Sequence, residues 1–157
     1  MLPYRILDTA YVEAKPEVLF AALTDFDKLP EWWPAHYHTK TIQSRATIEG
    51  REIYFYPNRL ITIGWRIHSA DPPHSFRLIY TRGWHTGHGL WKFEAEGTGC
   101  RISFHIDIHP KTRFYGLVYQ LINLPKRHSA DIHNIIHRLA LRVGASGSSD
   151  RTSKQLS

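Results

Sequence analysis

The fold of this chain is decided by residues 112–143, which read TRFYGLVYQLINLPKRHSADIHNIIHRLALRV. Apolar residues recur in this stretch at spacings of three and four, from Phe114 through Ile132 to Val143. Such spacings place them on one stripe of a long helix. Pro125 interrupts the pattern. Because proline lacks a backbone N–H and clashes with the preceding turn, we expect a kink or a break there. A long amphipathic helix also needs another surface to cover its apolar stripe.

The residues before this helix supply such a surface as seven strand-like runs. They cover residues 4–13, 37–48, 51–56, 60–69, 75–81, 86–95 and 100–109. Turn-forming residues separate the later runs, for example at 49–50 and at 97–99. The connections are short and contain no crossover helix, so the strands are expected to pair as an antiparallel meander.

Two short helices are expected between the first two strands. Residues 15–17 (Lys-Pro-Glu) open one of them, because proline suits the first turn and glutamate suits the positive N-terminal end of a helix. Residues 25–27 (Asp-Phe-Asp) begin a second helical turn, which ends at the prolines that follow. Trp32 and Trp33 lie at this corner, either as a plug at the end of the core or as one wall of a cavity mouth.

Several strands alternate between apolar and polar residues, which indicates a sheet with one buried and one wet face. The apolar positions are Ile61, Ile63, Trp65 and Ile67, then Phe76, Leu78 and Tyr80, and then Ile102, Phe104, Ile106 and Ile108. The predicted fold class is therefore α+β: a curved seven-stranded antiparallel sheet wrapped around a long C-terminal helix, with two short helices after strand 1. Such an architecture usually leaves a cavity between the helix and the sheet.

The chain of 157 residues fits one domain, which we place at residues 1–143. Residues 144–157 are rich in Gly and Ser, and we expect a disordered tail there. The single cysteine excludes an intramolecular disulfide. No run of 18 apolar residues and no signal-peptide pattern is present, so the expected location is cytoplasmic, without stable membrane insertion.

The formal net charge is +6, which raises the question of nucleic-acid binding. A nucleic-acid footprint is a patch, whereas Lys and Arg are scattered along this sequence, with 126–127 as the only adjacent pair. We therefore expect no nucleic-acid partner. The expected partner is a small hydrophobic molecule, bound by a monomer or a homodimer.

Two segments of the sequence resemble a known family. Residues 12–34 read VEAKPEVLFAALTDFDKLPEWWP, and residues 87–93 (GHGLWKF) are followed by GTGCRI at 97–102. These residues resemble the polyketide cyclase/dehydrase branch of the START-like (SRPBCC, Bet v 1-like) superfamily, over residues 4–143. The resemblance implies the helix-grip fold and a cavity for a lipid, hormone, polyketide or other apolar molecule. It implies no catalytic motif, because only some members of the superfamily are enzymes.

Two groups of histidines have spacings that permit metal binding. His105, Asp107 and His109 share one side of a strand, but successive side chains on that side stand nearly 7 Å apart, so three ligands rarely converge. His133 and His137 stand four apart in the helix, on the flank of the apolar stripe. We interpret both groups as solvent-facing and predict no metal and no cofactor.

His128 is different, because its helical position falls inside the apolar stripe. It is either a core histidine with a satisfied ring or a side chain that points into the cavity. If it enters the cavity, it is the best candidate in the chain for acid/base chemistry or for a hydrogen bond to a ligand. Asp131, three residues further on, is in a position to orient its ring.

Three hypotheses about function follow. The first is binding of a small or medium-sized lipid-, polyketide- or isoprenoid-like molecule. In this hypothesis the cavity walls are Trp33, Trp65, Tyr80, Trp91, Phe93 and Phe104, with His128 as the polar contact. The second is a polyketide cyclase or dehydratase in which His128 and a tyrosine move protons. The third is an interaction protein whose own aromatic side chains fill the cavity. A cavity of roughly 300 Å³ separates the first from the third, and a convergent titratable pair favours the second.

Overall fold

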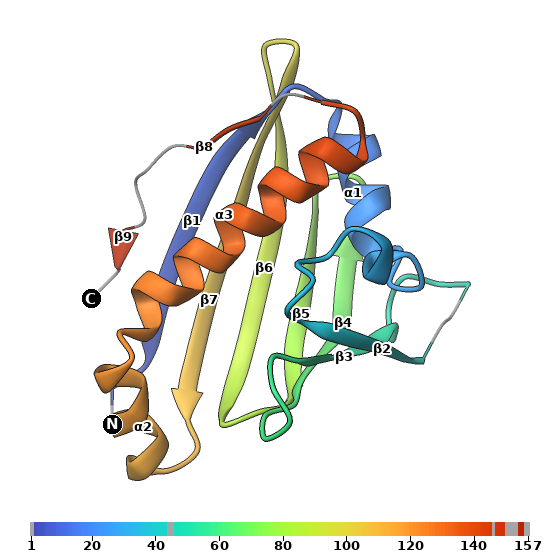
Figure 1. Ribbon diagram of the computed structural model, residues 1–157. Helices are drawn as coiled ribbons and strands as arrows, with labels where there is room; N and C mark the ends of the chain where they lie inside the picture. The colour runs from blue at the N-terminus through green and yellow to red at the C-terminus, as the bar shows by residue number, and fades with distance from the viewer. Residues whose placement is uncertain (1, 44–45, 146, 150–153, 156–157) are drawn as a thin grey trace.

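The computed structural model shows a curved sheet with a long helix lying across its inner face (Figure 1). It describes residues 2–43, 46–145, 147–149 and 154–155. The strands are β1 (Tyr4–Val12), β2 (His38–Gln43), β3 (Glu52–Tyr56), β4 (Ile63–Asp71), β5 (Ser75–Arg82), β6 (His85–Glu96), β7 (Gly99–Pro110), β8 (Gly147–Ser149) and β9 (Lys154–Gln155). The helices are α1 (Pro16–Thr24), the 3-10 helix η1 (Leu29–Glu31), α2 (Arg113–Leu121) and α3 (Leu124–Arg142).

Strands β1 to β7 form one antiparallel sheet. Neighbours in the sheet follow the order β2-β3-β4-β5-β6-β7-β1, so the first strand joins the edge formed by the seventh. The long pairing of β1 with β7 runs from Tyr4 opposite Ile108 to Val12 opposite Cys100. This arrangement confirms the predicted seven-stranded antiparallel sheet with a gripped C-terminal helix.

The C-terminal segment is two helices instead of one. α2 ends at Leu121, Asn123 adopts a left-handed conformation with φ of 51°, and α3 begins at Leu124 with Pro125 in its first turn. The predicted discontinuity at Pro125 is confirmed, because a proline is accommodated where the N–H groups of a new helix have no partners anyway. Gly144 ends α3 with a positive φ, and the N–H of Ala145 donates to the carbonyl oxygen of Ala140.

The tail differs from the expectation of disorder at the residues that the structure describes. Gly147–Ser149 pair with Ala10, Tyr11 and Val12, and Lys154–Gln155 pair with Ile6 and Leu7. Both short strands therefore lie along the free edge of β1, where unpaired backbone groups are available. The remaining tail residues lie outside the described part of the chain.

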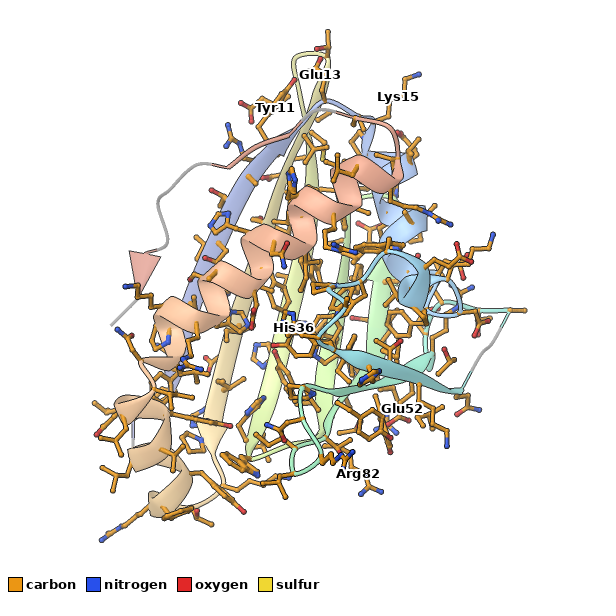
Figure 2. The ribbon with its side chains drawn as sticks, viewed as in Figure 1. Tyr11, Glu13, Lys15, His36, Glu52 and Arg82 are labelled. Carbon is orange, nitrogen blue, oxygen red and sulfur yellow. The ribbon has the colours of Figure 1, made fainter. Side chains whose placement is uncertain are left out.

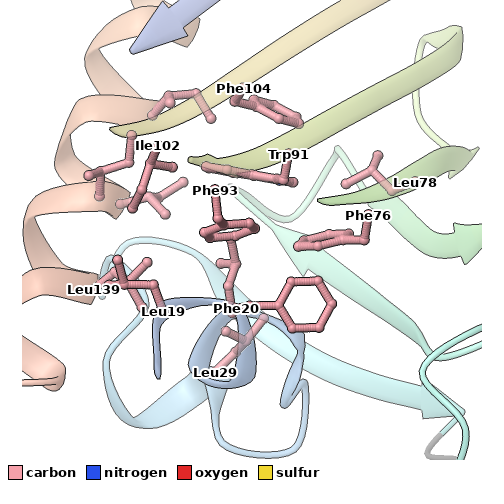
Figure 3. Close-up of a cluster of buried hydrophobic side chains, with 14 of the residues drawn as sticks. Leu19, Phe20, Leu29, Phe76, Leu78, Trp91, Phe93, Ile102, Phe104 and Leu139 are labelled. Atoms are coloured by element: carbon pink, nitrogen blue, oxygen red, sulfur yellow. The ribbon is translucent and has the colours of Figure 1, made fainter. Parts of the chain in front are cut away.

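The dry part of the core lies where α1 and α3 meet the sheet (Figure 3). Phe20 of α1 packs edge-on against Phe76 and Phe93, with ring centroids 5.8 and 5.6 Å apart. Leu19 and Leu139 are completely buried beside them. These side chains join the first helix, the last helix and the sheet into one hydrophobic core.

No helix in the described part of the chain has the length and the apolar character needed to span a membrane.

Candidate functional site

The candidate site is a cavity of about 290 Å³ between the sheet and the C-terminal helices. Its lining is mainly aromatic and aliphatic: Trp33, Phe55, Ile61, Ile63, Trp65, Tyr80, Trp84, Ile108, Tyr119, Ile122, Ile132 and Ile135. The exposed residues Asn58 and Arg127 also line it, so the cavity reaches the surface between the β3–β4 loop and the start of α3.

A larger hollow of about 640 Å³ lies elsewhere, between α1 and the segment that joins β2 to β3. Its lining includes the charged residues Glu17, Asp25, Asp27 and Arg51. This hollow is outside the interface of sheet and C-terminal helix, and it lacks a wall of aromatic side chains. The smaller inner cavity is therefore the better site for an apolar ligand.

One side of the cavity is built from interlocking aromatic rings. Trp33 stacks on Phe55 with ring centroids 4.9 Å apart and meets Trp65 edge-on at 5.7 Å. Both tryptophans are buried. The corner that carries Trp33 is fixed to α3, because Nε of Arg138 donates a hydrogen bond to the carbonyl oxygen of Trp32 at 2.6 Å. Trp33 is thus part of the core and part of the cavity wall.

The opposite side of the cavity carries a histidine–tyrosine pair. Nδ1 of His85 lies 2.7 Å from the hydroxyl oxygen of Tyr119, and His85 is buried. Its Nε2 is buried as well and has no hydrogen-bond partner within the described residues. An unpartnered buried polar atom is costly, so a ligand or a water that bonds to it is favoured.

Tyr119 reaches His85 because α2 is fixed against the sheet at two places. Trp84, next to His85, stacks on Tyr115 with ring planes 9° apart. Tyr4 of β1 meets Tyr119 edge-on at 5.9 Å. The side chain of Thr112 caps the first turn of α2 by accepting a hydrogen bond from the backbone N–H of Tyr115.

Burial shifts the protonation of several groups around the cavity, among them one histidine and two tyrosines. It lowers the pKa of His85 to about 4, and the neighbouring charges of His128 and Lys111 act in the same direction. Burial also raises the pKa of Tyr80 and of Tyr119 well above the ordinary range. Near neutral pH the cavity therefore presents a neutral imidazole and two neutral phenols, which donate and accept hydrogen bonds without charge.

A buried carboxylate lies under α3, beside the cavity. Asp8 is completely buried on the inner face of β1, and its oxygens face two imidazoles. Oδ2 is 3.6 Å from Nδ1 of His128, and Oδ1 is 3.7 Å from Nε2 of His133. These are ion-pair separations, longer than hydrogen bonds. Neither oxygen has a hydrogen-bond partner among the described residues. Because a buried carboxylate is costly unless it has a polar partner, these two imidazoles are the groups placed to face it.

His128 connects this polar group to the cavity. Its Nδ1 faces Asp8, its ring stacks on Phe104 with centroids 5.8 Å apart, and the side chain lines the cavity. His128 therefore combines the two alternatives, a core histidine and a cavity residue. Its ring contacts Asp8 and Phe104 in the core, and its side chain also forms part of the cavity wall.

Asp131 does not orient His128. Its Oδ2 accepts a hydrogen bond from the hydroxyl of Tyr37 at 2.7 Å, and Nε2 of His36 lies 3.9 Å from its Oδ1. Burial and this bond raise the pKa of Tyr37 far above its usual value. The carboxylate that holds His128 is Asp8, which comes from the first strand.

The structure divides the predicted ligand-binding residues into two groups. Trp33, Trp65, Tyr80 and His128 line the cavity. Trp91, Phe93 and Phe104 lie behind it in the core, and none of these three lines the cavity. Their position is a correction to the expected wall, and Gly89 explains part of it. A Cβ on Gly89 would meet the ring of Phe104 at 2.7 Å, so the glycine lets that ring lie flat against the sheet.

The histidine groups considered for metal binding are arranged differently. His105, Asp107 and His109 lie on the outward face of β7, where Asp107 pairs with Arg5 at 3.0 Å. His137 is exposed, as expected, whereas His133 is turned toward Asp8 and not onto a wet flank. Across residues 2–43, 46–145, 147–149 and 154–155, no three His, Cys, Asp or Glu side chains form a group that could hold a metal ion.

Sequence reasoning missed Asp8, His85 and Tyr119. Asp8 carries a signal, because it is a carboxylate between Ile6 and Ala10 on the apolar face of its strand. The sequence contains no signal for the pairing of His85 with Tyr119, because this contact depends on the angle at which α2 leaves the sheet.

The fold and the cavity define a class of protein: a helix-grip domain with a largely apolar cavity that opens to the surface and a few inward-facing polar groups. The chain belongs to the family described as polyketide cyclase / dehydrase and lipid transport, whose model matches residues 5–143. This match confirms the resemblance seen in the sequence. A comparison with curated proteins finds no significant match.

Solved structures support the fold. The chain is similar to one half of the di-domain ARO/CYC StfQ from the steffimycin biosynthetic pathway, with a TM-score of 0.71 and 16% identity over 91% of this chain and 51% of that one. A Thermus thermophilus protein aligns with a TM-score of 0.70 and 15% identity, over 88% and 96% of the two chains. A START superfamily protein from Mycobacterium smegmatis aligns with a TM-score of 0.69 and 12% identity, over 90% and 97%. At these identities the likeness concerns the fold alone.

Proposed function

We propose that the protein binds a small apolar molecule that carries one or two hydrogen-bonding groups, of a polyketide-, isoprenoid- or lipid-like kind, in the inner cavity. One observation carries this proposal: an apolar cavity in which His85, Tyr119, Tyr80 and His128 all take part in the lining. Apolar walls provide binding energy, while a few polar groups fix the orientation of the ligand.

The size of the cavity limits the ligand. A volume of about 290 Å³ corresponds to roughly ten water molecules. This space suits a compact molecule of one to a few rings, or a short isoprenoid, better than a lipid with two long chains. The rings of Trp33, Phe55 and Trp65 fill part of the interface between helix and sheet. On that side, the protein's own aromatic side chains occupy space that a ligand would otherwise take.

The neutral state of His85, Tyr80 and Tyr119 also points to a class of ligand. A neutral imidazole and neutral phenols bond well to hydroxyl and carbonyl groups, and these three groups provide no strong attraction for a carboxylate. The low pKa of His85 keeps its ring uncharged near neutral pH. A hydroxylated aromatic molecule therefore fits this part of the cavity better than a fatty-acid carboxylate does.

The test is calorimetric titration with 2-naphthol, a compact hydroxylated aromatic probe. His128→Ala removes a polar group from the cavity wall and is expected to weaken binding about three- to tenfold, the equivalent of one hydrogen bond. His137→Ala, on the exposed side of the same helix, is the matched control and should bind as the wild type does. Equal affinity for all three proteins, or no binding by the wild type, would contradict the proposal.

A second candidate is an acid/base enzyme that catalyses ring closure or loss of water from a polyketide-like substrate. The observation that favours it is the close His85–Tyr119 pair, in which burial shifts the pKa of both groups. Such reactions need one group that accepts a proton from carbon and another that donates a proton to the departing oxygen. A model β-hydroxyketone tests this candidate: water loss should be catalysed by the wild type and abolished in His85→Asn. Absence of catalysis by the wild type leaves simple binding as the function.

A further inference from the structure

The end of the molecule where the cavity opens carries an unpartnered apolar stripe. Phe114, Leu117 and Leu121 stand three and four residues apart on the outer face of α2 and are 66%, 54% and 77% exposed. The opposite face of this helix is buried at Gly116 and Tyr119. Large apolar side chains in such a row on the surface of one helix are typical of an interaction site.

A second apolar tip lies across the cavity mouth. Leu60 in the β3–β4 loop is 89% exposed. Its backbone N–H donates to Oδ1 of Asn58 at 2.8 Å, as does the N–H of Ile61 at 3.0 Å, so the loop is held in a defined turn. The residue after Leu60 is Ile61, and the residue after Leu121 is Ile122, and both of these line the cavity. The exposed apolar tips are therefore continuous with the cavity wall.

Basic residues surround these tips and account for most of the charge of the chain. Residues 57–62 and 111–127 contain Arg59, Lys111, Arg113, Lys126 and Arg127 and no Asp or Glu. All five side chains are exposed, and none forms an ion pair with a carboxylate in the described part of the chain. Without these five, fifteen Lys and Arg remain against fourteen Asp and Glu, so the rest of the chain is nearly neutral.

We propose that this end of the molecule docks on an anionic lipid surface, so that the cavity mouth faces the membrane. The docking face consists of Phe114, Leu117, Leu121 and Leu60 together with the five basic residues. The apolar side chains enter the layer between headgroup and acyl chain, while the basic side chains pair with lipid phosphates. A poorly water-soluble ligand then passes between the lipid and the cavity without crossing water.

The charge pattern separates this partner from two others. A second copy of the chain in a two-fold dimer would bring five cations against five cations, which is unfavourable. A nucleic acid would use the cations but would not need exposed leucines. An anionic membrane uses both kinds of side chain.

The test is co-sedimentation of the full chain with vesicles of phosphatidylcholine alone or mixed with phosphatidylglycerol. The wild type is expected to bind the mixed vesicles, less strongly as salt is raised, and to bind the neutral vesicles weakly. Leu117→Asp should weaken binding by at least about tenfold, because a leucine no longer enters the lipid. Leu141→Asp is the matched control, since Leu141 is also an exposed leucine of a helix, at the far end of α3. It should bind as the wild type does.

The charge is tested by the double variant Lys126→Glu/Arg127→Glu. At about fivefold per basic residue near an anionic surface, loss of two should weaken binding by at least about 25-fold. Lys15→Glu/Lys92→Glu makes the same change in net charge elsewhere. Figure 2 shows Lys15 at the opposite end of the molecule from Arg82, and neither Lys15 nor Lys92 lines the cavity. This control should retain most of the binding.

Three results would overturn the proposal: no binding of the wild type to mixed vesicles, equal effects of Leu117→Asp and Leu141→Asp, or a wild-type dimer that only Leu117→Asp dissociates. The proposal goes beyond the binding function and does not depend on the identity of the ligand. Titration with 2-naphthol in solution should be unaffected by Leu117→Asp, because Leu117 does not line the cavity, so failure of one proposal is distinguishable from failure of the other.

Discussion

The two halves of the helix–sheet interface are built on opposite principles. In the closed half, the apolar side chains of Phe20, Phe76, Phe93 and Leu139 fill the space between α1, α3 and the sheet. In the open half, the same sheet and the same helix enclose a cavity lined partly by His85, Tyr119, Tyr80 and His128. The closed half contributes stability, and the open half gives up packing for polar groups that line a cavity.

This difference locates the function. Looser packing and buried polar atoms both lower stability, because dispersion contacts are lost and hydrogen bonds to water are not replaced. A domain whose only requirement was to fold would be more stable with the open half packed like the closed half. The polar groups of the open half are therefore best explained by a ligand that satisfies them.

The largest expected effect comes from truncating matched phenylalanines in the two halves. Phe93→Ala should lower the free energy of unfolding by about 3–5 kcal/mol, because it leaves a void in a dry core. Phe55→Ala should cost clearly less, since that ring already borders the cavity. Urea denaturation measures both values. Equal losses would show that the open half is as tightly packed in solution as the closed half.

The second effect is a pH dependence that belongs to the open half. Burial lowers the pKa of His85 from 6.5 to about 4, so protons bind the unfolded chain before they bind the folded one. The stability due to a neutral His85 is therefore fully present above about pH 6.5 and is lost as the pH falls toward 4, by up to about 3 kcal/mol.

His85→Asn does not titrate in this range and keeps an amide near the position of Nδ1. Between pH 7 and pH 4 it should lose less stability than the wild type. Unfolding curves at several pH values give the difference. Parallel pH profiles for the two proteins would mean that His85 is hydrated and not buried.

The third effect is the coupling between Asp8 and His128. A double-mutant cycle with Asp8→Asn and His128→Gln should give an interaction energy of about 1–2 kcal/mol, as expected for charged groups in contact in the interior. The cycle of Asp8→Asn with His137→Gln is the control and should give a value near zero, because His137 is exposed. Equal interaction energies in both cycles would show that Asp8 and His128 do not form a specific ion pair.

The smallest effect concerns the hydrogen bond between Tyr119 and His85. Tyr119→Phe should lower the free energy of unfolding by about 1 kcal/mol, because it removes one hydrogen bond and keeps the ring. Affinity for 2-naphthol should change as well, since the freed Nδ1 of His85 also lies at the cavity. A loss above about 3 kcal/mol would show instead that the hydroxyl belongs to a larger network.

The sequence was sufficient for the fold because the fold depends on periodicity. The alternation of Ile102, Phe104, Ile106 and Ile108 placed β7 correctly, and Pro125 marked the break between α2 and α3. Both signals are local, since each depends on neighbouring residues along one element.

The site was predicted only in part because it depends on contacts between distant elements. Trp65 and Trp91 are both buried, yet only Trp65 borders the cavity. The register between strands decides which of the two tryptophans reaches it. Asp8 and His128 are 120 residues apart in the chain, and nothing in the local pattern of either residue indicates the other.

The most direct test of the two-halves account is to ask which tryptophans sense a bound probe. Trp33, Trp65 and Trp84 line the cavity, whereas Trp32 and Trp91 do not. In an NMR titration with 2-naphthol, the indole N–H signals of the first three should shift, and those of Trp32 and Trp91 should stay nearly in place. Shifts confined to Trp32 and Trp91, or no shift at any of the five, would contradict the claim that the open half is the ligand site.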